Sequence, residues 1–441
     1  ACARTPGAGN RKTRMDIEHT LTTPKIIWIP LTICLALASI STKFAGAAWA
    51  WLLIAGLVSL WITRISARDT LPDPLTHDLA RTWLMFTALA FLLKAISMLY
   101  WHDPWAERHA ELRLLLGAVG LYGITRLYGL SHQALRYLAI AGIVYCAAGL
   151  SIILFFGHSK TPTNIIPWAA SVSIISCWLL SLVFIDTESP KSWRWFVLAG
   201  STIGLLTVLV TEKRGAYGLA IVLPCMGLLL WRQQTVSQPT SLKIQKHWKI
   251  YVTCVLLGIV GLWSIKNTSL IERPVYAINL AIKEFKSSQA SLAKNYNSNV
   301  GARLYLWAQT AKAIPESPWV GYGHDQRKQL LKQWAIDTQL PDAPVFGHVH
   351  SDYLHTLLDH GLWGLASFLS YAVGLMVLTL KLLRHKAKAH AIGLTGILLM
   401  HLTTALSNVN LAHNYYPTIL SLVICITLWS AKGSSKTTTA P

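Results

Sequence analysis

The chain has 441 residues, of which 53% are apolar and only 13% charged, and its 39 Lys and Arg outnumber its 19 Asp and Glu, giving a formal charge of +20. Soluble domains are about one quarter charged, so this composition excludes an ordinary water-soluble domain and indicates a membrane protein. Acidic residues are few and apolar sequence is abundant, so the basic excess favours the Lys/Arg bias of cytoplasmic loops over a nucleic-acid-binding surface.

The N-terminal residues 1–25 are expected to form a cytoplasmic tail. Within it, residues 1–14 are rich in Pro, Gly and basic side chains and look like an added leader or a disordered tail. No convincing cleavage site follows the first apolar run, which we interpret as a retained membrane anchor. Six of the seven cysteines lie inside apolar runs, so no disulfide framework is implied.

Twelve apolar stretches approach the length of about 20 residues that a membrane-spanning helix needs. They cover residues 26–41, 45–63, 79–100, 112–130, 135–156, 165–185, 193–211, 215–231, 250–265, 361–383, 387–408 and 415–431. Backbone in lipid must satisfy its own hydrogen bonds, and these stretches lack the alternation of a β-barrel. The sequence therefore predicts an all-α polytopic membrane protein, with nine spans in residues 26–265 and three in residues 361–431.

The Lys and Arg residues predict the orientation of these spans. If the N-terminus is cytoplasmic, the inner segments hold 22 Lys and Arg and the short outer loops hold 6. Positive residues favour the cytoplasmic side, so both termini, including the tail 432–441, are expected there. The 95-residue segment 266–360 is then expected to face outward.

This outer segment is nearly neutral, with 10 basic and 8 acidic residues, and its apolar residues recur at helical spacing. Two sets show the spacing: Val275, Ile278, Ile282 and Phe285, then Leu304, Trp307, Ala311 and Ile314. A turn at 315–323 and a short helix at about 326–335 follow. We expect a small helical cap lying on the membrane surface.

Several kinds of chemistry find no support in the sequence. There is no Walker A loop, and Gly321-Tyr322-Gly323 lacks the rest of a nucleotide-binding fingerprint. No Asp-x-Asp pair occurs, and the outer segment has no close carboxylate cluster that would bind a divalent cation. We therefore expect no metal, cofactor, nucleotide or nucleic acid. Paired carboxylates for glycoside hydrolysis are not visible, although spacing does not exclude them.

The stretch from His350 to Gly364 carries the strongest motif. It reads His350-Ser351, nine residues, Gly361, two residues and Gly364, and so fits the pattern His-[Asn/Ser/Gln]-x9-Gly-x-x-[Gly/Thr/Tyr]. The chain thereby resembles the bacterial O-antigen ligase and O-antigen polymerase superfamily, over nearly its whole length. Arg214, at the start of the eighth span, and Arg303, ahead of the glycine-rich turn, fit as well. Ser351 stands where Asn is common in the family.

The resemblance implies a metal-independent glycosyltransferase of GT-C-like fold in the bacterial inner membrane, with its active site facing the periplasm. The expected donor is O-antigen polysaccharide on undecaprenyl diphosphate. The expected acceptor is a sugar hydroxyl of lipid A-core, and the lipid bilayer is the remaining partner.

The residues make chemical sense for this reaction. A diphosphate leaving group gains charge as the sugar–oxygen bond breaks, and guanidinium groups stabilise such charge. Arg214 and Arg303 are therefore the candidate catalytic cations that bind the donor diphosphate, and Lys94 is a further possible phosphate contact. His350 is the candidate general base. Ser351 and Asp352 are expected to begin a helix whose dipole keeps the imidazole neutral.

Simpler readings exist for each residue. His350 taken alone fits a hydrogen-bonded loop histidine, and Arg214 fits a headgroup-seeking arginine at a helix end. Arg303 fits a partner of lipid phosphate or of Glu316, while Lys94 fits a lysine that reaches the interface. Three other functions also stay open: O-antigen polymerase, protein O-oligosaccharyltransferase, and, from a different class, a flippase or transporter of lipid-linked sugars.

Overall fold

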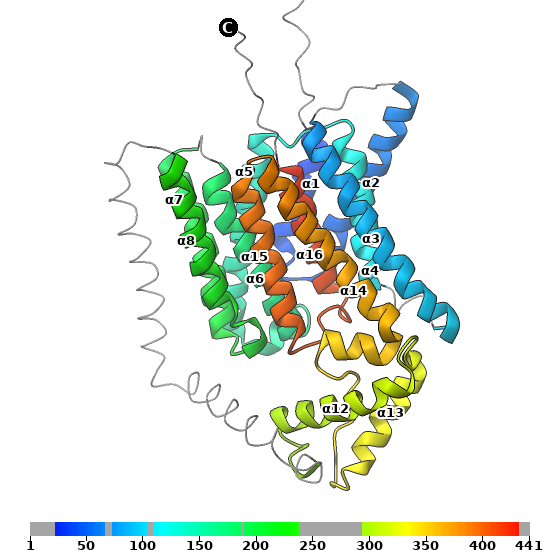
Figure 1. Ribbon diagram of the computed structural model, residues 1–441. Coiled ribbons are helices and arrows are strands. Elements are labelled where there is room, and N and C mark those ends of the chain that lie inside the picture. Colours follow the sequence, from blue (N-terminus) through cyan, green and yellow to red (C-terminus); the bar gives the residue numbers. More distant parts are fainter. Residues whose placement is uncertain (1–22, 67–72, 104–108, 187–188, 238–292, 432–441) are drawn as a thin grey trace, which may run out of the picture.

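The computed structural model describes residues 23–66, 73–103, 109–186, 189–237 and 293–431, which form thirteen α-helices (Figure 1). Eleven belong to a bundle: α1 (Lys25–Leu37), α2 (Thr42–Ser66), α3 (Pro74–Trp101), α4 (His109–Thr125), α5 (His132–Ser151), α6 (Ile165–Ile185), α7 (Lys191–Val210), α8 (Leu219–Ser237), α14 (Asp352–Arg384), α15 (Lys388–Ala405) and α16 (Tyr415–Trp429). Two form a cap at one end, α12 (Asn299–Ala313) and α13 (Gly323–Asp337).

Eleven of the twelve predicted spans lie in the described residues, and each coincides with a bundle helix. The remaining stretch, 250–265, lies outside the described residues. Among the described residues, six helices are long and apolar enough to cross a membrane, and α1, α8 and α16 are shorter apolar helices. An all-helical polytopic membrane protein is thus confirmed, while the count of twelve, the GT-C-like architecture and the orientation stay predictions.

The helix expected from Ser351 and Asp352 and the tenth predicted span, 361–383, are two parts of one helix in the structure. Helix α14 begins at Asp352 and continues through a kink at Gly361, where the backbone is not helical. Hydropathy identifies only the part of α14 after the kink, because the part before the kink is polar. That polar segment, 352–360, is where the bundle meets the cap.

The centre of the bundle is built from closely packed helices. Helix α6 packs against α7, α15 and α16, and 89% of its most apolar window is buried, so other helices rather than lipid surround it. Helices α2 and α4 also approach closely, because a Cβ added to Gly56 would lie 2.2 Å from the carbonyl oxygen of Gly120. Small residues that let two backbones touch are typical of helix packing in membranes.

The two ends of the bundle differ in chemistry. At the end far from the cap, ion pairs join neighbouring helix ends: Arg136 to Asp186 at 3.3 Å and Lys381 to Asp78 at 2.7 Å. Basic residues concentrate at this end, which is the end predicted to be cytoplasmic. The cap lies at the opposite end of the bundle (Figure 1), and the orientation of the two ends in the membrane stays a prediction.

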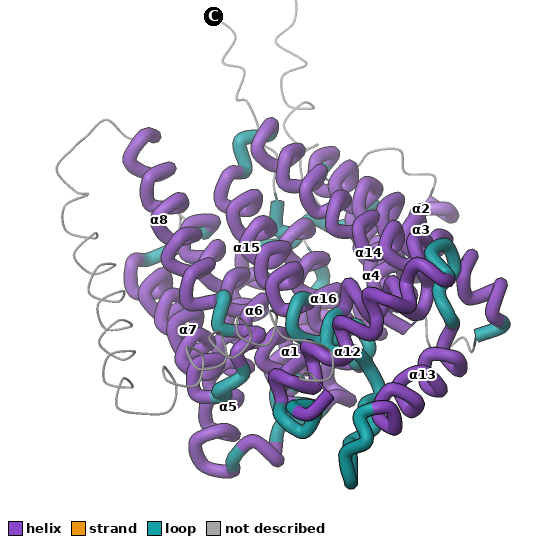
Figure 2. The backbone as a smooth tube through the Cα atoms, turned by 60° about the horizontal axis from the view of Figure 1, so that its bottom comes forward, coloured by secondary structure: helices purple, strands orange, loops and turns teal. Residues whose placement is uncertain are grey.

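The cap covers the bundle over α3 and α14 (Figure 2). Helix α12 matches the predicted spacing from Leu304 to Ile314, and α13 matches the predicted helix at 326–335, whereas the spacing from 275 to 285 lies outside the described residues. The cap has an apolar core of its own, formed by Tyr296, Leu306, Leu331, Trp334 and, from α14, Leu358. The first segment of α14 therefore belongs to the cap as much as to the bundle.

Candidate active site

The glycine of the long motif permits the kink in α14. Gly361 has φ +58° and ψ −149°, a conformation that residues with a side chain rarely adopt. A Cβ at this position would lie 2.5 Å from the carbonyl carbon of Trp319 and 2.6 Å from the carbonyl oxygen of Pro318. The next backbone N–H, that of Leu362, donates a hydrogen bond of 2.7 Å to the Pro318 carbonyl. The turn of the cap thus occupies the space that a side chain would need.

The glycine-rich turn of the cap completes this joint from the other side. Gly321 has φ +63°, and a Cβ there would lie 2.5 Å from the carbonyl carbon of Asp359. The backbone N–H of Tyr322 donates to the carbonyl of Leu358 at 2.8 Å. The two motifs that carry the resemblance are therefore the two halves of one contact, which fixes the segment 352–360 against the cap.

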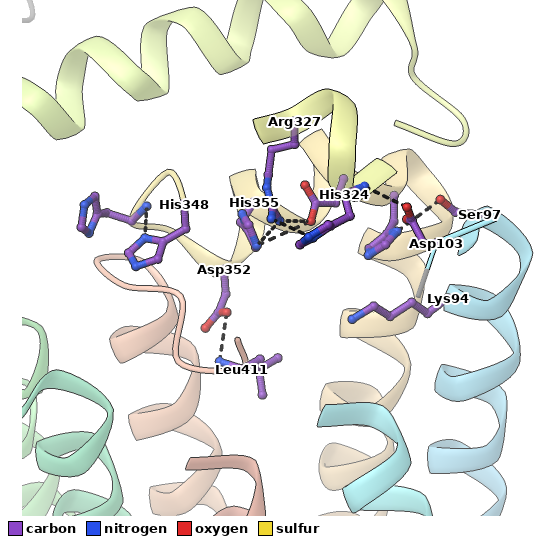
Figure 3. A network of polar contacts seen from close by, with 12 residues as sticks. Lys94, Ser97, Asp103, His324, Arg327, His348, Asp352, His355 and Leu411 are labelled. Carbon is purple, nitrogen blue, oxygen red and sulfur yellow. Dashed lines mark hydrogen bonds and ion pairs between the residues drawn. The ribbon is translucent and has the colours of Figure 1, made fainter. Parts of the chain in front are cut away.

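His350 lies just before the start of α14, two residues from its first helical residue, and has φ +57°, which is uncommon for a residue with a side chain. Its ring packs against His348, with centroids 4.4 Å apart, and against Phe346 at 5.2 Å. Its backbone N–H donates to Nδ1 of His348 at 3.3 Å (Figure 3). Within the described residues, the buried Nδ1 of His350 has no hydrogen-bond partner.

Burial, His348 and the positive charge of Arg303 lower the pKa of His350 to about 3. Burial, His413, Arg327 and Arg303 lower the pKa of His348 to about 4. Both imidazoles are therefore neutral at any physiological pH, as was expected for His350. Burial is the largest cause, in place of the helix dipole that the sequence suggested.

Arg303 lies on α12 and is half-buried. Its charge acts on the pKa of both His348 and His350. Four residues along the same helix, Trp307 donates its indole N–H to the carbonyl of Val349 at 2.8 Å. The helix that carries the predicted phosphate-binding cation is thus bonded directly to the loop that carries the predicted base.

Arg214 begins a short 3-10 turn, Arg214–Ala216, that packs on α6 and α15. The structure describes its backbone, while its side chain lies outside the described part. A Cβ at the next residue, Gly215, would lie 2.3 Å from Oγ of Ser407. The residue after Ser407, Asn408, accepts a hydrogen bond from the backbone N–H of Asp352 at 3.2 Å. The backbone of Arg214 thus adjoins the loop that holds the start of α14.

Lys94 lies on α3 and pairs with Glu111 of α4 through an Nζ to Oε2 distance of 2.9 Å. Both side chains are largely buried, with 13% and 6% of their surface exposed. The ammonium group of Lys94 therefore already has an anionic partner in the protein. Its role as a phosphate contact stays a prediction. Ser351 is also buried, and its side chain makes no capping hydrogen bond to α14.

Sequence reasoning missed several polar residues of this region, which Figure 3 shows as one layer between cap and bundle. Asp352 begins α14, as expected, but its carboxyl group is buried and accepts hydrogen bonds from the backbone N–H groups of Asn410 and Leu411 at 3.1 and 3.3 Å. Arg327 and Asp359 form a buried ion pair. Neither pair has a signal in the sequence, since its partners lie 32 to 59 residues apart. Of the polar residues in this region, only His348, which lies two residues from His350, could have been inferred from the sequence.

In the described ranges, no group of three or more His, Cys, Asp or Glu side chains has a geometry that would hold a metal ion. The imidazoles of the site are spread out: the rings of His355 and His413 lie 6.5 and 6.4 Å from that of His348. The groups that this site provides for a reaction are therefore cationic side chains and neutral imidazoles.

Residues 196–369 match a family described as O-antigen ligase. The family includes ligases, polymerases and O-oligosaccharyltransferases. The matched range contains Arg214, Arg303, His350 and the glycines of the cap–α14 contact. The match supports the resemblance at the level of the superfamily.

A protein of Haemophilus influenzae, described as uncharacterized, is 26% identical over 273 residues. The similarity covers 59% of this chain and 63% of the relative, so the chain spans less than two thirds of that protein. The relative's description assigns no substrate.

Proposed function

We propose that this protein is an O-antigen ligase, a metal-independent inverting glycosyltransferase. It would move O-antigen polysaccharide from undecaprenyl diphosphate to a sugar hydroxyl of lipid A-core, at the periplasmic face of the inner membrane. The supporting observation is a neutral, half-buried imidazole, His350, that lies at the contact between cap and bundle and whose pKa is lowered in part by the charge of Arg303.

The reaction needs one proton acceptor and one site for negative charge. The acceptor hydroxyl attacks the anomeric carbon on the face opposite the diphosphate, and the bond between that carbon and the phosphate oxygen breaks. The electron pair leaves with undecaprenyl diphosphate, whose charge Arg303 and Arg214 stabilise. The hydroxyl proton passes to His350. One bond forms and one breaks on opposite faces, so the anomeric configuration inverts.

Donor binding changes the basicity of His350. A pKa of about 3 makes the free imidazole neutral but a weak base. A diphosphate bound to Arg303 offsets the positive charge that contributes to this low value. The pKa of His350 then rises in the donor complex, so the group becomes more basic when the substrate that needs it is present.

The test is transfer by the purified protein in detergent or vesicles, with lipid-linked O-antigen as donor, no ATP, and EDTA present. Three acceptors are compared: lipid A-core, a second lipid-linked O-unit, and a peptide. Product with lipid A-core supports the ligase. Product only with the O-unit or the peptide would instead show a polymerase or an O-oligosaccharyltransferase, and donor movement across vesicles without product would show a transporter.

His350 is tested by replacement with Ala and with Gln. Positioned bases contribute about 10² to 10⁴ in rate, so we expect kcat to fall by a factor in that range. The control is His385→Ala, because His385 is an exposed histidine at the opposite end of α14. Wild-type turnover by His350→Ala would refute the assignment of the base.

A further inference from the structure

A buried cluster of charged and polar groups joins the cap helix α13 to the first segment of α14. Its centre is Arg327, of which only 4% is exposed. Nη1 of Arg327 donates to Oδ2 of Asp359 and to Nε2 of His355, the latter at 3.0 Å. Nη2 donates to Nδ1 of His324 at 3.0 Å. One guanidinium thus links three side chains from two helices (Figure 3).

The cluster acts on a short piece of chain whose ends are both fixed. At the kink end, Asp359 stands two residues before Gly361 and is held by Arg327. At the other end, the carboxylate of Asp352 is held by the backbone N–H groups of Asn410 and Leu411. His350, the proposed base, lies just outside this fixed segment, so its position follows from the position of the segment.

Only arginine provides this geometry. A guanidinium is planar and presents donors in a fixed fork, whereas a lysine ammonium is a flexible point charge. By donating to Nε2 of His355 and Nδ1 of His324, Arg327 also fixes which nitrogen of each ring accepts. Its charge lowers the pKa of His348, the ring that packs on His350. Arg327 therefore affects both the placement and the protonation of the rings beside the reaction centre.

We propose that Arg327, through Asp359 and His355, is the positioning residue for His350 in the transfer reaction. The proposal rests on the proposed function. It assigns Arg327 no contact with donor or acceptor, because its two nitrogens Nη1 and Nη2 already serve protein partners. Its loss would displace the base without removing a group that binds either substrate.

The experiment compares three variants of the full-length protein: Arg327→Lys, Arg327→Gln and, as control, Lys328→Gln. Lys328 is the exposed neighbour of Arg327 on the same helix. A misplacement near 1 Å lowers turnover about 10²-fold, so we expect both Arg327 variants to lose kcat by that order with little change in the KM for donor. Arg327→Lys should fail to rescue. Lys328→Gln should match wild type.

Unaltered kcat in both folded Arg327 variants would overturn the proposal. A rise in KM at constant kcat would overturn it too, because Arg327 would then bind substrate. Where Arg327→Gln does not fold, Arg327→Met with Asp359→Leu removes both buried charges together and restores the fold with the base still misplaced.

A second measurement is independent of the substrate. Hydrogen exchange of the backbone at residues 348–360 should rise in Arg327→Lys and stay at the wild-type level in Lys328→Gln. If the wild type transfers nothing, the proposed function fails while this exchange result still tests whether Arg327 holds the segment. If exchange is unchanged in a folded Arg327→Lys variant, the positioning role fails whatever the reaction is.

Discussion

Replacing Gly361 by Ala tests the cap–α14 contact directly. The backbone conformation at Gly361 costs about 1–3 kcal/mol for a residue with a side chain. The added Cβ would lie 2.5 Å from the Trp319 carbonyl carbon, where 3.4 Å begins ordinary contact, a shortfall of about 0.9 Å. The obstructing atoms are backbone, so relief requires moving the cap turn or the helix, at about 1–3 kcal/mol more. We expect a loss of roughly 2–6 kcal/mol in local stability.

A shift of this size at the kink also moves the segment that precedes it. We expect kcat for glycan transfer to fall about 10²-fold, since displacement of a catalytic group by about 1 Å has that effect. The assay is transfer with purified protein, together with the midpoint of thermal unfolding in the same detergent. The control is Gly347→Ala, three residues before His350, where an added Cβ meets nothing within 4 Å. Equal turnover and unfolding midpoints in the two variants would refute the role assigned to Gly361.

Three further predictions concern charge. The neutral form of His350 is the base, and it is lost as pH falls through the pKa of about 3. Because kcat/KM reports the free enzyme, the titration of His350 should cause no change in kcat/KM between pH 5 and 8. The acid limb of kcat should lie at higher pH than that of kcat/KM, and coincident limbs would refute the effect of the donor. Glu111→Gln leaves the buried ammonium of Lys94 unpaired and should lower the midpoint of thermal unfolding. The double variant Lys94→Met with Glu111→Leu should recover the wild-type midpoint. Equal midpoints for the wild type and both variants would contradict a buried ion pair. EDTA should leave initial rates unchanged, because Arg303 and Arg214 supply the positive charge, and restoration of lost activity by added Mg²⁺ would disprove this.

Most of the helices could be predicted from the sequence because membrane spans carry a strong local signal: an apolar run of sufficient length. The kink in α14 could not, because hydropathy identifies only its apolar part, and no local signal shows that the helix expected from Ser351 and Asp352 continues into that part. His350 was predictable from a motif within one stretch of chain. Arg327, Asp359 and Asp352 were not, because each is partnered only after the cap folds back on the bundle, across 32 to 59 residues.

The structure also gives a physical meaning to the spacing of the motif. The nine residues between Ser351 and Gly361 form one helical segment, which at about 1.5 Å per residue is roughly 13 Å long. Its start is fixed beside His350 and its end beside the turn of the cap. One residue more or less would rotate its two ends by about 100° relative to each other, so Asp359 would no longer face Arg327 while the start of the segment keeps its place beside His350. The spacing therefore couples the docking of the cap to the placement of the base, and a chain that keeps the histidine but changes the spacing should lose the reaction geometry.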